Sequence, residues 1–130
     1  MGDVKIIITK GDRVKKTLEY DTGPDVNAEA GDQVTWVVES GSGVAAITEI
    51  KQYLSSDEHP ASMDLFAGQG GVEPHPTNAQ KTEWQGTLST SVNLLEVEWY
   101  SITWTSVGGG WHNQDVGGIV TDPKIQIKQR

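Results

Sequence analysis

Three histidines are the residues best suited to chemistry in this sequence: His59, His75 and His112. With carboxylates such as Asp57 and Glu58 nearby, they offer the imidazole and oxygen ligands that zinc or copper binds in proteins. No two of them stand at a spacing that a single strand or helix would present to one ion. We therefore interpret them as ordinary loop histidines. A His-based metal-binding protein is the last of three functional hypotheses, and the other two are given below.

Other catalytic patterns are missing from the sequence. It contains no cysteine, which excludes disulfides, thiolate metal ligands and thiol nucleophiles. The serines near His59 form no Gly-x-Ser-x-Gly elbow, and residues 108–110 lack the Lys-Ser/Thr of a phosphate-binding loop. Glu96 and Glu98 fall on one face of a predicted strand, where we interpret them as solvated rather than as a catalytic pair. The sequence therefore predicts no enzyme activity.

A glycine-rich stretch, residues 107–115, holds the strongest candidates for ligand or partner binding. One aromatic and three polar residues follow one another there: Trp111, His112, Asn113 and Gln114. A flat aromatic side chain beside neutral hydrogen-bonding groups suits a sugar or a hydrophobic side chain of a partner protein. The alternative is that Trp111 folds back and plugs the end of the domain. Residues 51–81 are the second candidate recognition loop.

The elements that would position these loops are predicted to be strands. Apolar residues alternate or form short runs rich in Val, Ile, Thr, Trp and Tyr, and glycines and prolines separate the runs. This pattern predicts an all-β sandwich of seven or eight strands with a long Pro/Gly-rich loop at 51–81. The predicted strands are residues 4–9, 14–20, 33–39, 44–50, 82–88, 97–105, 118–121 and 124–128, with a short edge segment at 26–32. We also expect a helical turn around 62–66 and a bulge at Gly86.

Strand parity indicates which side chains form the core. Trp36 alternates with Val34 and Val38, so we place it between the sheets. Trp99 and Trp104 have opposite parity on one strand, so one of the two must lie on an outer face or an edge. In the last strand, apolar residues alternate cleanly with polar ones, and the apolar ones are predicted to point inward.

Size and charge restrict the function classes. A chain of 130 residues is expected to form one domain, residues 1–130. Its net charge of −8 argues against nucleic acid or an anionic membrane as the main partner, because both are polyanions. No apolar stretch approaches the length of a transmembrane helix or a signal-peptide core, so we expect a cytoplasmic protein.

Two stretches resemble cupredoxin-like sandwiches: AGDQVTWVV at residues 30–38, and WYSITWTS…GGIVTDPKIQI at residues 99–127. The resemblance implies a Greek-key β-sandwich in which a Gly-Asp turn leads into a core strand. The copper ligands of electron carriers with this fold do not carry over. Residues 40–44 contain no histidine, cysteine is absent, and Val116 stands where a methionine ligand would be expected. The resemblance therefore implies a copper-free member with no cofactor.

The layout is also similar to AidA/PixA-type bacterial inclusion-body proteins. The matching stretches are Gly31 to Trp36, Pro60 to Pro76, Tyr100 to Trp104, and Asp122 to Ile125. This resemblance implies a non-enzymatic binding, interaction or storage-like accessory protein. The second hypothesis is a carbohydrate-binding module that uses the Trp111 loop. The expected partner is thus an unknown protein or a neutral carbohydrate, and exposed edge strands leave a homodimer open.

Overall fold

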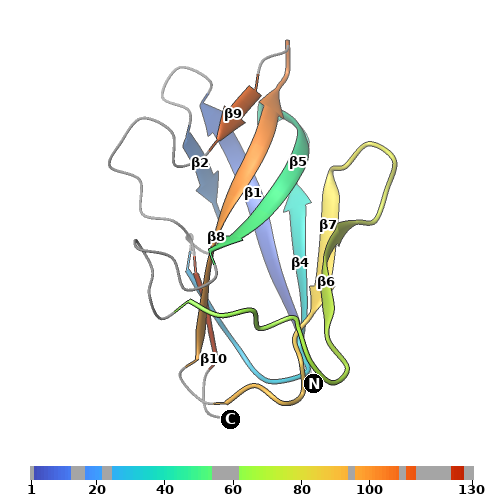
Figure 1. Ribbon diagram of the computed structural model, residues 1–130. Helices are drawn as coiled ribbons and strands as arrows, with labels where there is room; N and C mark the ends of the chain where they lie inside the picture. Colours follow the sequence, from blue (N-terminus) through green and yellow to red (C-terminus); the bar gives the residue numbers. More distant parts are fainter. Residues whose placement is uncertain are drawn as a thin grey trace.

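The computed structural model describes residues 2–12, 17–21, 25–53, 62–93, 96–108, 111–113 and 124–127. These residues form ten strands in two five-stranded sheets and contain no helix, so the prediction of an all-β, sandwich-like protein is confirmed (Figure 1). The strands are β1 (Asp3–Asp12), β2 (Thr17–Tyr20), β3 (Val26–Ala28), β4 (Gln33–Val38), β5 (Val44–Tyr53), β6 (Val72–Pro76), β7 (Glu83–Thr87), β8 (Val97–Ser106), β9 (Trp111–Asn113) and β10 (Lys124–Ile127). No helix within the described ranges is long and apolar enough to cross a membrane.

Both sheets mix parallel and antiparallel pairs. The first sheet has the order β2-β1-β4-β7-β6, and β1 runs parallel to β4. The second has the order β3-β10-β8-β5, and β3 runs parallel to β10. β9 also pairs with β8, so β10 and β9 follow one another along the same side of this central strand. Because the chain passes repeatedly between the sheets, apolar faces from distant parts of the sequence meet in one core.

Trp36 lies at the centre of this core, as its strand parity predicted. It is fully buried, and its Nε1 donates a hydrogen bond to Tyr100 Oη at 3.2 Å. The rings of Trp36 and Tyr100 pack edge to face with centroids 5.6 Å apart, and the Phe66 ring lies 6.2 Å away. These three aromatic rings join β4 of the first sheet, β8 of the second and a turn between β5 and β6.

Parity on β8 and β10 also agrees with prediction. Trp104 is fully buried, whereas Trp99 is half-buried on the opposite face of β8. Ile125 and Ile127 of β10 point into the core. The predicted strand at 118–121 lies outside the described residues.

Residues 51–81 do not form one long loop. β5 extends through residues 51–53, and β6 pairs with β7 at the edge of the first sheet. The prolines of the VEPHP sequence hide this strand from a pattern search, yet proline is tolerated on an edge strand because its missing N–H costs no ladder bond on the open side. The described residues therefore contain more strands than predicted.

The turn before β6 differs from the predicted helical turn. Leu65 and Phe66 are buried, but Met63 is 40% exposed. Tertiary hydrogen bonds replace helical ones, since the Met63 amide donates to Val97 O and the Ser89 amide donates to Leu65 O. Burial of two adjacent apolar side chains was predictable, whereas the conformation depends on strands distant in sequence.

Gly86 does not form the predicted bulge. The register of β7 with β4 is regular through it, and the irregularity lies in β6, between Val72 and His75. A Cβ at Gly86 would lie 2.8 Å from Phe66 Cε1 and 3.1 Å from Val72 O. The glycine is therefore needed to let the Phe66 ring pack on the strand.

Candidate functional site

An open hollow of about 540 Å³ lies at one end of the sandwich. The start of β5 and the end of β8, which border it, lie toward the top of Figure 1. Its size falls within the range of about 300–1,000 Å³ that is common for small-molecule sites. Three segments line it: the β4–β5 turn, the end of β8 and the residue before β7. The lining residues are Val38, Glu39, Ser40, Gly41, Gly43, Val44, Thr82 and Val107.

The hydrogen-bonded turn between β4 and β5 shapes this hollow. Gly41 and Gly43 adopt positive φ angles of 82° and 87°, a region that residues with a Cβ avoid. The Val107 amide donates to Gly43 O at 2.9 Å, and the Gly11 amide donates to Ser42 O at 2.8 Å. The β4–β5 turn is thereby fastened to both β1 and the end of β8, so the hollow belongs to the folded framework.

The lining offers apolar walls with a polar rim. Val44 is buried, Val38 is half-buried, and Val107 is 64% exposed. Glu39 and Ser40 are exposed beside them. Such a surface can take an apolar group and hydrogen-bond a hydroxyl or amine attached to it.

The predicted binding stretch begins near the same end of β8 as the hollow, on the side of β8 opposite β5. Its first part is not a loop, because the backbone of Trp111, His112 and Asn113 forms β9 and pairs with Thr103–Thr105 of β8. Trp111 is opposite Thr105, two residues before the hollow-lining Val107. The side chains of these three residues, and all of Gln114, lie outside the described part, so their binding role remains a prediction.

The histidines gain no support as a metal site. His75 is exposed on β6, where its Nδ1 lies 3.0 Å from Glu73 O. β6 is an edge strand of the first sheet, whereas His112 belongs to a strand beside β8 in the second. His59 lies outside the described residues. Within the described ranges, no group of three His, Cys, Asp or Glu residues is arranged to hold a metal ion.

Glu98 is buried, contrary to the expectation of a solvated side chain. It is 1% exposed, and its Oε1 accepts a hydrogen bond from the Leu65 amide at 2.7 Å. Its phase on the strand with Tyr100, Ile102 and Trp104 places it on the core face, and this phase is the signal that could have predicted the burial. Burial raises the pKa of Glu98 to about 8, although its hydrogen bonds to Leu65 and Gln52 favour the charged form.

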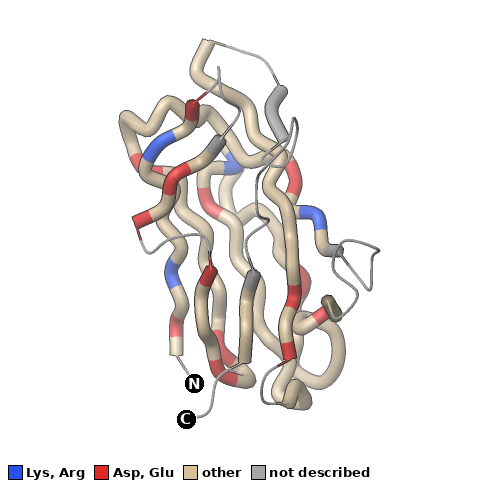
Figure 2. Tube along the Cα trace, turned by 90° about the vertical axis from the view of Figure 1, so that its left-hand side faces the viewer, with Lys and Arg blue, Asp and Glu red and all other residues tan. Residues whose placement is uncertain are grey.

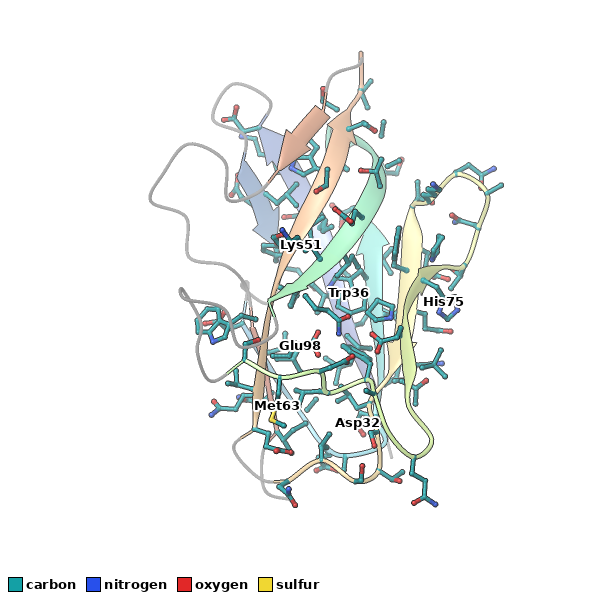
Figure 3. The ribbon with its side chains drawn as sticks, in the orientation of Figure 1. Asp32, Trp36, Lys51, Met63, His75 and Glu98 are labelled. Carbon is teal, nitrogen blue, oxygen red and sulfur yellow. The ribbon has the colours of Figure 1, made fainter. Side chains whose placement is uncertain are left out.

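Two further carboxyl groups gather around Gln52 beside Glu98. Gln52 Nε2 donates to Glu98 Oε2 and to Asp64 Oδ1, each at 2.9 Å. The Glu73 carboxyl of β6 lies near both Asp64 and Gln52. Partial burial and then the Asp64 carboxyl raise the pKa of Glu73 to about 7. Figure 3 shows that Glu98 lies toward the end of the sandwich opposite the hollow.

The chain matches no protein-family profile and no curated protein sequence.

Proposed function

We propose that this protein is a non-enzymatic, copper-free β-sandwich of the cupredoxin-like type that binds a small neutral ligand or a partner's side chain at the hollow. The observation that carries the proposal is the position of the hollow. It includes Val107, just after β8, and β9, which contains three of the four predicted binding residues, pairs with β8 up to Thr105.

The topology supports the cupredoxin-like part of this proposal. The two parallel pairs, β1 with β4 and β3 with β10, come from a chain that repeatedly changes sheets, as in Greek-key sandwiches. The Gly-Asp turn has a structural role before β4. Gly31 has a φ of 82°, and Asp32 accepts hydrogen bonds from the amides of Gly2 and Glu29 at 2.7 and 2.9 Å. A glycine followed by an aspartate is therefore what this turn requires.

The lining of the hollow favours binding over catalysis. Among the described residues, its polar side chains are one carboxylate, Glu39, and the hydroxyls of Ser40 and Thr82, with no imidazole or second carboxylate to complete an acid–base pair. The acidic residues are spread over several strands (Figure 2), and the net charge of −8 disfavours anionic ligands. A neutral ligand with an apolar face fits these properties best.

A neutral carbohydrate is the second candidate ligand. Sugars combine an apolar C–H face with hydroxyl groups, and the hollow combines valine walls with a carboxylate and two hydroxyls. The aromatic platform that such a site needs would come from Trp111, the first residue of β9.

The test is a titration of the ¹⁵N-labelled protein with neutral mono- and disaccharides and with short peptides that contain a single aromatic or aliphatic residue. Binding should shift the amides of Val38, Val44 and Val107. Val107→Arg, which fills the hollow from an exposed position, and Trp111→Ala should each abolish those shifts. Val72→Arg is the matched control, because Val72 is a 46% exposed valine far from the hollow.

The outcomes separate the alternatives. Shifts confined to the hollow with sugars alone support the carbohydrate-binding alternative, and shifts with peptides alone support a protein partner. Binding that survives Val107→Arg contradicts the placement of the site at the hollow. If the Trp111→Ala variant unfolds, Trp111 closes the end of the core and does not belong to the binding site.

A further inference from the structure

The first half of β1, Asp3–Ile7, lies at an open edge of the first sheet, and we call it the β1 edge. β2 pairs with β1 only from Ile8 to Asp12, whereas β4 pairs with β1 from Asp3 to Ile8. Figure 1 shows β2 beside the upper part of β1 alone, and Figure 2 looks onto this side of the molecule. Among the described strands, none pairs with the β1 edge on the side away from β4.

Two contacts with the β4 side fix the direction of the backbone groups of β1. The Gln33 amide donates to Gly2 O, and the Glu39 amide donates to Ile8 O, each at 3.0 Å. In a strand, the N–H and C=O of one residue point to the same side, and successive residues alternate between the two sides. The even-numbered residues of β1 therefore face β4, and the odd-numbered residues face the open side.

Ile7 follows this rule at the upper limit of the β1 edge. Its carbonyl oxygen accepts a hydrogen bond from the Asp21 amide at 3.0 Å, and its amide donates to Asp21 Oδ1 at 3.3 Å. Asp3 and Lys5 point their N–H and C=O groups the same way, and in the described part of the chain these groups form no hydrogen bond. The β1 edge thus offers donors and acceptors to a further strand.

The other edges of the two sheets carry features that hinder strand pairing. β6 contains two prolines and an irregular register, β5 has two irregularities, and β2 and β3 are only four and three residues long. On β5, the Ile47 amide is also occupied, because it donates to Lys81 O at 2.9 Å. The β1 edge has no proline and keeps a regular register with β4, so it is the edge best suited to accept a strand.

The side chains of the β1 edge combine two opposite charges with one apolar residue. Asp3 and Lys5 are exposed, whereas Val4 is half-buried and packs against the core. Thr35 Oγ1 donates to Asp3 Oδ1 at 3.3 Å, which leaves Asp3 Oδ2 available to a cation. Lys5 has no ion-pair partner among the described residues. An acid and a base two residues apart on one face are complementary to the same strand running in the opposite direction.

Backbone direction and charge together select one register for pairing with a second copy. Two copies related by a two-fold axis pair antiparallel, and outward-facing residues must lie opposite outward-facing residues. With the axis at Val4, Asp3 lies opposite Lys5 of the second copy. The neighbouring registers place Asp3 opposite Asp3 or Lys5 opposite Lys5, and like charges directly opposite each other are destabilising. Registers nearer Ile7 are blocked, because Asp21 occupies its outward groups.

We propose that the β1 edges of two copies pair antiparallel about a two-fold axis at Val4 and join the two first sheets into one continuous sheet. The Asp3 amide donates to Lys5 O of the second copy, whose Lys5 amide donates to Asp3 O. On the outer face, each Lys5 ammonium lies beside an Asp3 carboxylate, and the two Val4 side chains meet on the inner face. The proposal does not depend on the hollow, which lies near the other end of β1, where the Gly11 amide donates to Ser42 O.

The short length of the paired segment predicts a weak, reversible dimer. Stable interfaces bury about 1,200–2,000 Å², far more than two strands of a few residues can bury. The net charge of −8 on each copy also opposes their approach. At an ionic strength of about 0.15 M, this repulsion is screened beyond about 8 Å, whereas charges in contact still attract. We therefore expect association at high protein concentration and physiological ionic strength.

Sedimentation equilibrium tests the pairing with charge variants. At protein concentrations up to about 1 mM, even a dimer with a Kd of about 1 mM is populated, so the wild type should associate. Asp3→Lys and Lys5→Glu should each lower the association constant at least about tenfold, because both cross-strand pairs become like-charged. An equimolar mixture of these two variants should associate as the wild type does, because one strand is then basic and the other acidic. Lys81→Glu makes the same charge change at an exposed residue beyond the edge and should leave association unchanged.

Amide hydrogen exchange of the unaltered protein provides a second measurement. Protection of the Asp3 and Lys5 amides should rise with protein concentration, whereas the Val4 and Ile6 amides, which face β4, should show no change. This measurement decides the question if a charge variant does not fold. The proposal is overturned by a wild type that stays monomeric up to about 1 mM, the concentration at which a weak dimer is populated. Unchanged association of either charge variant, an equimolar mixture that stays monomeric, or exchange at Asp3 and Lys5 that does not depend on concentration would overturn it as well.

Discussion

Replacement of Trp36 by alanine is expected to remove most of the stability of this protein. The indole is fully buried, and truncation of a buried tryptophan costs about 3–5 kcal/mol. Tyr100 Oη also loses its described donor, a hydrogen bond worth about 1 kcal/mol. The edge-to-face contact with Tyr100 adds about 0.5–1.5 kcal/mol. Because these contributions overlap, we expect a total of about 4–6 kcal/mol, against about 5–15 kcal/mol for a whole domain.

Urea denaturation followed by far-UV circular dichroism measures this loss, because a fluorescence signal would change with the removal of a tryptophan. Tyr100→Phe isolates the hydrogen bond and should cost about 0.5–1.5 kcal/mol. Trp99→Ala is the matched control on the outer face of β8, and it should cost at least about 2 kcal/mol less than Trp36→Ala. If Trp36→Ala does not fold, Trp36→Phe should cost about 1–3 kcal/mol. A loss below about 1.5 kcal/mol for Trp36→Ala with an unchanged m-value would refute the assignment of Trp36 to the centre of the core.

Three further predictions concern pH, packing and metals. The free energy of unfolding of the wild type should match that of Glu98→Gln near pH 5 and fall below it by several kcal/mol at pH 9. The reason is that Glu98 keeps its proton up to a pKa of about 8 in the folded protein but releases it near 4.5 in the unfolded chain, and each pKa unit corresponds to about 1.4 kcal/mol. Identical pH profiles of the two proteins in urea titrations would contradict this. Gly86→Ala should cost about 1–3 kcal/mol in the same assay, because the alanine Cβ would press on the Phe66 ring. In the double variant, Phe66→Leu should recover part of this cost, and losses of stability that simply add would argue against the contact. Added copper should give no intense visible band and should leave on dialysis, since the chain has no cysteine; retention of one equivalent would favour the histidine-based alternative.

Local sequence patterns predicted the parts of the fold that depend on residue alternation. Trp36, Trp104 and the isoleucines of β10 are buried as their parity indicates, because a strand must alternate its side chains between two faces. The same rule puts Glu98 on the core face, although its charged side chain favours an exposed position. β6 is not apparent from the sequence, because its prolines hide a strand that is stable only as an edge partner of β7.

The candidate site was predictable only in part. The sequence predicts binding residues after residue 106, and the backbone of three of them forms β9, which pairs with β8 up to Thr105, two residues before the hollow-lining Val107. The hollow itself has no local signature, because its walls come from β4, β5, β8 and the approach to β7, which meet only after the sheets pack. The gathering of carboxyl groups around Gln52 is similarly invisible in the sequence, since Gln52 and Glu98 lie 46 residues apart.

The sequence by itself determined that the chain is all-β, which side chains of its clearest strands point inward, and that thiol and copper–thiolate chemistry is excluded. Each of these follows from residue type and from short-range periodicity, neither of which depends on a long-range contact. Tertiary structure alone decided that β1 pairs in parallel with β4, that Gly86 accommodates the Phe66 ring, and that Gln52 lies among three carboxyl groups. Burial, repulsion and hydrogen bonding at these places arise between segments distant in sequence, so their energies exist only once the two sheets have come together.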